Sequence, residues 1–185
     1  LAKSNLGRDE EAIKDYDEAI KLDPKLAVAY SNRGLAKTNL GQDEEAIKDC
    51  DEAIKLDPKL PLAYGNRGHA KSNLGRFEGA IKDYDQAIKL GSKDAKTFNK
   101  RGLANYNLGK HEEAIKDYND ALKLNPKNAV VFYNLGVAKG SQGKNIEALK
   151  DFKKTAYHLK SKIKINTHKD EYKIIKEKIK HLLAK

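Results

Sequence analysis

Apolar and polar residues alternate along the chain with the period of an α-helix. In one stretch, apolar side chains return every three or four residues, at Ala46, Ile47, Cys50, Ala53 and Ile54. This spacing places them on one face of a helix that is bounded by Gly41 before it and by Pro58 after it. A second helical stretch, from about residue 60 to residue 74, ends at Gly75, where glycine can adopt the left-handed conformation that closes a helix. The pattern predicts a pair of helices.

The same pattern returns every 34 residues. It aligns a row of glycines, a row of alanines and a row of aspartates, at Gly7, Gly41, Gly75, Gly109 and Gly143, at Ala12, Ala46, Ala80, Ala114 and Ala148, and at Asp15, Asp49, Asp83, Asp117 and Asp151. Prolines that stop a preceding helix stand at three of the boundaries, at Pro24, Pro58 and Pro126, whereas the third unit has Gly91 and Ser92 there. Each unit is therefore predicted to be a helical hairpin.

The unit that begins at Ala27 resembles a tetratricopeptide repeat. The signature of that family falls on Tyr30, Arg33, Gly34, Lys37, Ala46, Cys50, Ala53 and Pro58. Arg33, Lys37 and Cys50 depart from the leucine, tyrosine and aromatic residue that the family usually has there. The resemblance implies an all-α fold, a right-handed α-solenoid superhelix of antiparallel helix pairs. It also implies that the first helix of each pair lines a concave groove.

In this register the predicted organisation is an array over residues 1–165 and a basic amphipathic capping helix over residues 166–185. The array comprises a partial repeat, 1–26, and four repeats, 27–60, 61–94, 95–128 and 129–162. The partial repeat predicts an incompletely covered apolar end, through which copies of the chain can self-associate. Glycines inside the first helices, such as Gly34, predict that the facing helix, which bears Ala46 or its equivalents, approaches closely.

Carried over from the family by position, the groove residues are mainly polar or aromatic. The candidate binding residues are Asn32, Asn66, His69, Asn73, Lys96, Asn99, Lys100, Tyr106, Asn107, Tyr133 and Asn134. The last unit adds Val130, Val137, Gly140 and Ser141 to the same face. An asparagine amide offers both a donor and an acceptor, which suits the backbone of an extended peptide. The alternative is that these amides remain solvated or form hydrogen bonds within the repeat.

Two of the candidates form a basic spot. Lys96 and Lys100 lie one helical turn apart, and we expect them next to Asn66. The three residues resemble part of the two-carboxylate clamp by which some family members hold the acidic carboxyl-terminal tails of chaperones. Ser31 and Leu35 do not match the lysine and asparagine of that clamp. The prediction is a protein or peptide partner with acidic character, of which a chaperone tail is a narrower case.

The candidate chemistry gives no support for catalysis or for a cofactor. The histidines at positions 69, 111, 158, 168 and 181 lack a spacing suited to zinc. Cys50 replaces an aromatic residue of the second helix, which predicts a small buried side chain and no nucleophile. Glu44, Glu45 and Asp49 recur with the repeat and are expected in the first helical turn and at the surface. We therefore predict that the chain is not an enzyme.

The net charge of +10 is concentrated in the last quarter of the chain, where residues 144–185 hold 13 lysines and 5 acidic residues. Thr167 and Asp170 resemble a helix-capping box, and Tyr172, Ile175, Ile179, Leu182 and Leu183 share one face of the helix that follows. We expect this helix to cover the last apolar stripe of the array. The competing interpretation is a basic tail that binds nucleic acid or an anionic membrane. The absence of arginine after Arg101 disfavours it.

Together these features predict a non-catalytic scaffold that binds an extended peptide or partner protein in its groove. The alternative is an accessory module of a larger enzyme or assembly factor. The chain has no run of about 18 apolar residues, so we expect no transmembrane segment. A single cysteine favours a reducing interior, and hence the cytoplasm.

Overall fold

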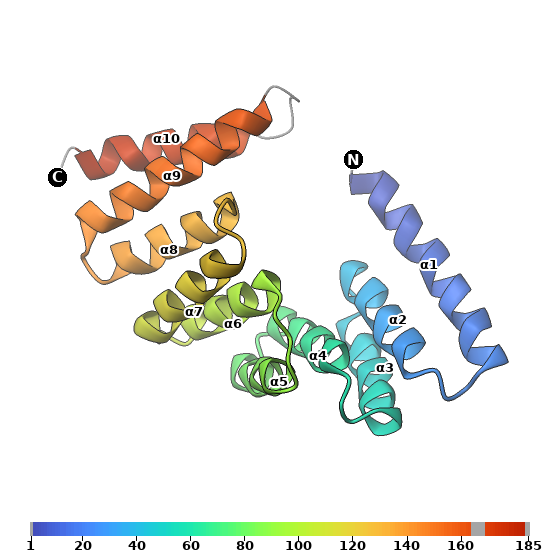
Figure 1. Cartoon of the computed structure of the whole chain (residues 1–185). Helices are drawn as coiled ribbons and strands as arrows, with labels where there is room; N and C mark the ends of the chain where they lie inside the picture. Colours follow the sequence, from blue (N-terminus) through green and yellow to red (C-terminus); the bar gives the residue numbers. More distant parts are fainter. Residues whose placement is uncertain (1, 164–168, 184–185) are drawn as a thin grey trace. The chain divides into compact units, whose positions relative to one another are not determined.

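The computed structural model describes residues 2–163 and 169–183, and over these ranges it is all-helical, without a strand (Figure 1). This confirms the predicted fold class. The helices are α1 (Ala2–Leu22), α2 (Ala27–Asn39), α3 (Asp43–Leu56), α4 (Pro61–Asn73), α5 (Phe77–Lys89), α6 (Ala95–Asn107), α7 (His111–Leu124), α8 (Ala129–Ser141), α9 (Asn145–Ile163) and α10 (Lys169–Leu183). The chain divides into two compact units, Leu1–Lys93 and Asp94–Lys185.

Both units are built from stacked helical hairpins. In the first unit α2 pairs with α3 and α4 pairs with α5, while α4 also contacts α2 and α3, and α1 packs on α2. In the second unit α6 pairs with α7 and α8 pairs with α9, while α8 also contacts α6 and α7, and α10 packs on α9. Each first helix therefore lies beside the next first helix in its unit, which places their equivalent residues along one face.

Glycines with a positive φ close the hairpins, as at Gly41 and Gly109, where φ is 77° and 74°. Just after the first of these turns, the N–H of Gln42 donates to the carbonyl oxygen of Lys37 at 2.9 Å. Gly7 differs, because α1 continues through it as a single helix.

Glycines inside the first helices make room for a side chain of the paired helix. A Cβ atom at Gly68 would lie 2.9 Å from the Tyr84 ring, and one at Gly102 would lie 2.8 Å from the Tyr118 ring. At Gly34 the nearest atom is the Cys50 sulfur, also at 2.9 Å. The close approach that the glycines predict is thus present. The nearest contact is the aromatic ring or the Cys50 sulfur, and at Gly34 the backbone oxygen of Ala46 follows at 3.0 Å.

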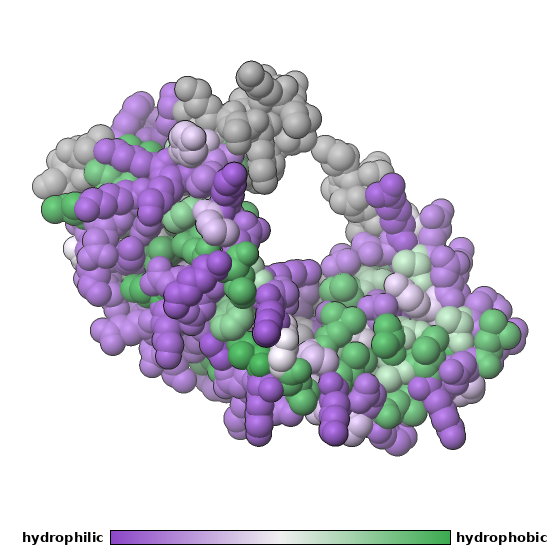
Figure 2. Space-filling view, in the orientation of Figure 1, coloured by the Kyte–Doolittle hydropathy of each residue, from purple (hydrophilic) through white to green (hydrophobic). Residues whose placement is uncertain are grey.

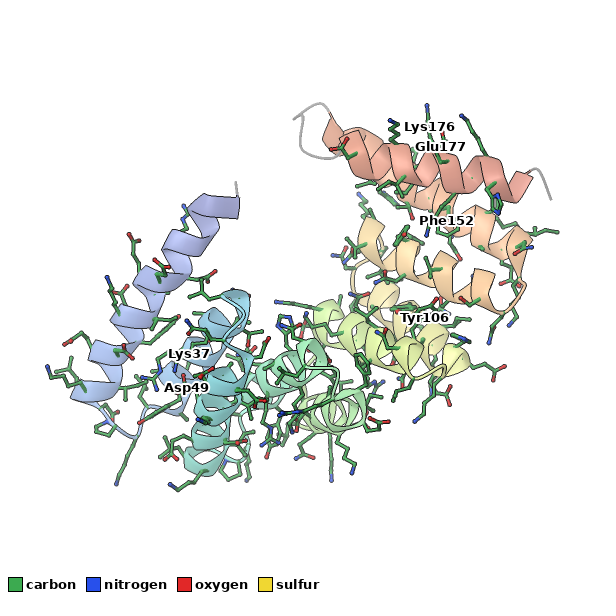
Figure 3. The ribbon with its side chains drawn as sticks, turned by 180° about the vertical axis from the view of Figure 1, so that it is seen from behind. Lys37, Asp49, Tyr106, Phe152, Lys176 and Glu177 are labelled. Atoms are coloured by element: carbon green, nitrogen blue, oxygen red, sulfur yellow. The ribbon has the colours of Figure 1, made fainter. Side chains whose placement is uncertain are left out.

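A repeated ion network explains the arginines that depart from the family signature. Arg33 donates to both carboxylate oxygens of Asp49, at 2.9 and 2.6 Å, and to Asp17 at 2.6 Å. Lys37 also pairs with Asp49, at 2.7 Å (Figure 3). Arg67 forms the same bonds in the next repeat. The expectation that Asp49 lies at the surface was wrong, because it is only 6% exposed. Two cations make its burial favourable.

Hydrophilic side chains cover much of the face shown in Figure 2. Among the helices described, none is both long enough and apolar enough to cross a bilayer. At the end of the second unit, α10 contacts α9 through Ile175, which is buried, and Ile179, which is partly buried. Thr167 of the expected capping box lies outside the described residues, as do the side chains of Tyr172, Leu182 and Leu183.

Candidate peptide-binding face

Two of the predicted groove asparagines form hydrogen bonds between successive first helices. The side-chain NH2 of Asn66 on α4 donates to the backbone oxygen and to Oγ of Ser31 on α2, at 3.0 and 3.1 Å. In the second unit, the NH2 of Asn134 on α8 donates to Oδ1 of Asn99 on α6, at 3.0 Å. Asn66 is 7% exposed. These amides stabilise the stacking of repeats. The predicted roles were contact with a ligand, solvation or hydrogen bonds within one repeat.

Two further groove asparagines, Asn73 and Asn107, are exposed, and their side-chain amides already form hydrogen bonds within the protein. Asn73 donates to Asp43 at 3.0 Å. Asn107 donates to the backbone oxygen of Leu103, one turn earlier in its own helix, at 2.8 Å. Because each amide can form further bonds to water or a ligand, these residues stay candidates. Their internal bonds make a principal role in binding less favourable.

The remaining candidates of the first unit are Asn32 and His69, both half-buried on first helices. The Asn32 side chain forms no hydrogen bond with any residue that the structure describes, so both its donor and its acceptor are free for a ligand. His69 lies on α4, three residues after Asn66. Both stay predictions.

The two candidate tyrosines connect neighbouring helices of the second unit. The hydroxyl of Tyr106 on α6 lies 3.0 Å from Oγ of Ser141 on α8. The hydroxyl of Tyr133 on α8 accepts a hydrogen bond from Nζ of Lys178 on α10, at 2.7 Å. That same Nζ lies 4.6 Å from the centre of the Tyr133 ring, a cation–π contact. Polar side chains thus join α6 to α8 and α8 to α10.

Lys96 and Lys100 differ from these saturated groups. Within the described part of the chain, neither ammonium group has an ion-pair or hydrogen-bond partner. Lys96 is exposed, whereas Lys100 is half-buried. Burial, together with the nearby charge of Lys96, lowers the pKa of Lys100 to about 8. A buried cation without a counter-ion is unfavourable, so an anion bound at this place would remove part of that penalty.

Lys100 occupies the repeat position of the stacking asparagines. Within the units, the residues 35 apart are Ser31 with Asn66 and Asn99 with Asn134, whereas the residue 35 positions before Lys100 in the sequence is Gly65, which has no side chain. Asn66 and the two lysines belong to different units, so the expected proximity of Asn66 to the basic spot stays a prediction. Within α6, Lys96, Asn99 and Lys100 are at positions i, i+3 and i+4, which lie on one face of a helix. Two cations and an amide on one face can hold a carboxylate together with a peptide group.

The other reactive groups have structural explanations. Cys50 is fully buried, and burial raises the pKa of its thiol to about 12. A thiol in this state is a poor nucleophile and a poor metal ligand. Among the described residues, no three His, Cys, Asp or Glu side chains gather in a way that could hold a metal ion. Burial also raises the pKa of Asp117, which interacts with Arg101 and Asn105.

Comparison with family models identifies the repeats along most of the chain. A model described as "TPR repeat" matches residues 5–41, 72–109 and 106–143. A second model, described as "Tetratricopeptide repeat", matches residues 27–60. No curated protein matches the chain.

Solved structures with a similar fold include proteins that bind peptides. A crystal structure of MamA is 27% identical, with a TM-score of 0.75, over 88% of this chain and 95% of that one. The first TPR of Spaghetti (RPAP3), bound to the HSP90 peptide SRMEEVD, is 30% identical, with a TM-score of 0.61, over 63% of this chain and 93% of that one. YrrB, described as a TPR protein with an unusual peptide-binding site, is 18% identical, with a TM-score of 0.69, over 90% of this chain and 91% of that one. The last match bears on the fold alone.

Proposed function

The chain belongs to the tetratricopeptide repeat family, and from this premise we propose that it is a non-catalytic scaffold that binds an extended, acidic segment of a partner protein. Repeats of this family are in general interaction scaffolds. The observation that carries the acidic specificity is the pair Lys96 and Lys100 on α6, whose ammonium groups have no partner among the described residues. A carboxylate from the partner would supply the missing counter-charge.

The polar groups around the two lysines support an extended ligand. The amide of Asn99 uses its oxygen as an acceptor for Asn134, which leaves its NH2 group to donate to a peptide carbonyl. Leu103, one turn further along α6 from Asn99, is 44% exposed and offers an apolar contact. Each hydrogen bond would add about 0.5 to 1.5 kcal/mol, so several contacts along an extended chain are needed.

The chaperone-tail version of this proposal has narrower support. The relative that binds SRMEEVD is similar to this chain over 63% of the length of this chain. Lysine lacks the planar fork with which arginine recognises a carboxylate, and Ser31 and Leu35 depart from the clamp. We therefore propose an acidic peptide as the ligand class, with SRMEEVD as one probe of it. The lone, buried thiol of Cys50 supports our placing this function in a reducing compartment such as the cytoplasm.

Titration with labelled peptides tests the proposal. The probes are SRMEEVD and the heptapeptide Asp-Glu-Phe-Glu-Glu-Leu-Asp, and the control is a heptapeptide in which each carboxylate is replaced by an amide. We expect fluorescence anisotropy to give micromolar affinity for at least one acidic probe and at least tenfold weaker binding of the amide control. No binding of either acidic probe at about 1 mM, or equal binding of the amide control, would contradict the proposal.

A matched pair of variants locates the site. Lys100→Met removes the charge and keeps a similar side-chain length, and we expect it to weaken the acidic heptapeptide about tenfold. Lys89→Met makes the same change on α5, at an exposed lysine for which the structure describes no partner, and should leave affinity unchanged. Equal losses in both variants would indicate non-specific attraction to positive charge, and not a site on α6.

A further inference from the structure

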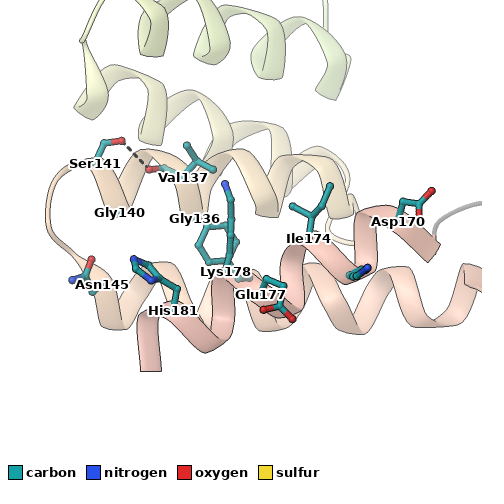
Figure 4. Close-up of a pocket in the computed structure, with 12 residues that line it drawn as sticks. Gly136, Val137, Gly140, Ser141, Asn145, Asp170, Ile174, Glu177, Lys178 and His181 are labelled. Carbon is teal, nitrogen blue, oxygen red and sulfur yellow. Dashed lines mark hydrogen bonds between the residues drawn. The ribbon is translucent and has the colours of Figure 1, made fainter. Parts of the chain in front are cut away.

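Helix α10 and the last hairpin border an open pocket at the surface. The cavity lies between α8, α9 and α10 and has a volume of about 850 Å³, within the range of ligand-binding pockets (Figure 4). Its apolar wall includes Val137 and Phe152, and the glycines Gly136 and Gly140 leave space along α8. Ile174 of α10 also lines it and is 55% exposed. We call this cavity the α10 pocket.

The α10 pocket continues the face that holds the proposed peptide site. Val137, Gly140 and Ser141 are groove positions of the last repeat, and all three line the pocket. Ser141 lies 3.0 Å from the hydroxyl of Tyr106 on α6. Val137 and Lys178 also line a smaller cavity, of about 200 Å³, together with Leu103 of α6. A segment bound along α6 and α8 would therefore reach the pocket without leaving this face.

The pocket exists because α10 approaches α9 more closely than it approaches α8. Its buried residue Ile175 joins a core that α9 forms with Ala129 of α8, and no close backbone packing between α10 and α8 occurs in the described residues. Across the remaining space, Lys178 forms its hydrogen bond with Tyr133. The lysine side chain thus holds α10 beside α8 while leaving apolar surface between them uncovered.

The lining of the pocket is balanced in charge, with Lys173 and Lys178 against Asp170 and Glu177, and it leaves one lysine available to a carboxylate. Glu177 is paired with Lys180 at 3.1 Å, whereas Lys173, which lines the pocket, has no carboxylate partner among the described residues. Asp170 is the other acidic residue at the rim.

We propose that the α10 pocket binds a bulky apolar side chain of the acidic partner segment and that Lys173 contacts a carboxylate next to that side chain. The inference rests on the proposed function and extends it, because it assigns part of the specificity to α10, which the sequence indicated only as a cap. Burial of a leucine or phenylalanine side chain in the pocket should strengthen binding about 10- to 100-fold.

The test compares two acidic peptides, Asp-Glu-Phe-Glu-Glu-Leu-Asp and a counterpart with glycine in place of phenylalanine and leucine. Wild-type protein should bind the first peptide at least tenfold more tightly. Gly140→Leu should remove this preference by filling the pocket. A Cβ atom at position 140 would meet only the Ala148 Cβ, at 3.9 Å, so the helix need not move. Equal affinities in wild-type protein, or a preference that survives Gly140→Leu, would overturn the proposal.

Two controls separate the pocket from other effects. Gly79→Leu changes a helical glycine of α5, where a Cβ atom would lie 3.5 Å from the Lys71 side chain, and should retain the wild-type preference. Lys173→Glu should weaken the apolar acidic peptide at least fivefold, whereas Lys153→Glu, an exposed lysine of α9, should not. Circular dichroism melting curves establish that each variant is folded. If Gly140→Leu is unfolded, Val137→Phe takes its place as the pocket-filling change.

The outcomes also distinguish the pocket from the proposed function. If both peptides bind equally and Lys100→Met weakens both, the acidic site on α6 stands and the α10 pocket is refuted. If neither peptide binds, both proposals fail. If sedimentation shows a dimer that Gly140→Leu dissociates, the occupant is a second copy of the chain, and the proposed peptide occupant is wrong.

Discussion

Helices α4 and α6 carry different residues at one equivalent position of the repeat, Asn66 and Lys100. The amide of Asn66 is 7% exposed and donates two hydrogen bonds to Ser31 of the preceding repeat. The ammonium group of Lys100 has no such partner in the described chain, and its pKa is lowered to about 8. One position therefore serves stacking in α4 and is available for a ligand in α6. A family signature that assigns both to the groove does not separate these roles.

The largest effect is expected where a saturated network is broken. Asp83→Ala removes the carboxylate that pairs with Arg67 at 2.6 Å and with Lys71 at 2.8 Å. We expect a loss of about 2 to 3 kcal/mol in the free energy of unfolding, since two partly buried cations lose their partner and only partly regain water. Urea denaturation measures it. Lys82→Ala on the exposed side of α5 is the control, with a change within about 0.5 kcal/mol.

The loss of stability in Asp83→Ala should not be accompanied by a loss of affinity for the acidic heptapeptide. Asp83 is part of the ion network of the first unit, so Asp83→Ala should bind with wild-type affinity wherever it is folded. A tenfold loss of affinity in folded Asp83→Ala would show that the network contributes to binding as well.

A smaller effect is expected for the stacking amide. Asn66→Ala removes the side-chain donor that bonds the buried backbone oxygen and hydroxyl of Ser31, which should lower the free energy of unfolding by about 1 to 2 kcal/mol. Asn73→Ala removes one exposed bond to Asp43 and should cost about 0.5 kcal/mol. Thermal and urea denaturation compare the two variants. Unchanged stability of Asn66→Ala together with weaker peptide binding would reverse the roles assigned to α4 and α6.

The smallest change in stability should have the opposite sign. Lys100→Met removes a half-buried charge, and we expect the free energy of unfolding at pH 7 to rise by about 1 kcal/mol, a value reduced for solvent screening. Between pH 8 and the ordinary lysine pKa of 10.5, the unfolded lysine binds more protons than the folded one, so wild-type stability rises with pH. The difference between variant and wild type should therefore disappear near pH 10.5.

Urea denaturation of wild type and variant at pH 7, 8.5 and 10 measures this convergence. Lys96→Met, at the exposed lysine one turn earlier, is the control and should change stability by less than about 0.5 kcal/mol at each pH. A Lys100→Met protein that is less stable than wild type at pH 7 would indicate a favourable interaction of Lys100 within the fold.

The sequence was sufficient for the helices of the regular repeats because the signals for them are local. Pro61 at the start of α4 and the left-handed Gly75 after it act within a few residues. The same rule was wrong for Gly7, because α1 continues through this glycine as a single helix.

Contacts between repeats were harder to predict because they depend on how helices stack. Periodicity alone placed Asp49 at the surface, whereas Arg33 and Lys37 surround it in the fold. A signal was present: arginine precedes aspartate by 16 residues in three successive repeats, at Arg33, Arg67 and Arg101. The spacing of 35 between Ser31 and Asn66 was another. A constant spacing between residues that can form an ion pair or a hydrogen bond indicates that they contact each other within the fold and are not held free for a ligand.

The α10 pocket could not be predicted at all. The pattern of α10 indicates which residues are apolar, and Ile175 and Ile179 were placed on its buried face. Whether such a helix packs evenly on both helices of a hairpin depends on side-chain volumes and on contacts such as that between Lys178 and Tyr133. Only the folded arrangement shows that Ile174 and Val137 line the same space.

The most direct test of the account is the affinity of the acidic heptapeptide for wild-type, Asn66→Ala and Lys100→Met proteins, measured by calorimetry at pH 7 and pH 9.5. Wild-type and Asn66→Ala proteins should bind alike at pH 7 and lose about tenfold in affinity at pH 9.5, as Lys100 loses its proton. Lys100→Met should bind about tenfold more weakly at pH 7 and change little with pH. Wild-type affinity in Lys100→Met, or a loss confined to Asn66→Ala, would contradict the assignment of the binding site to α6.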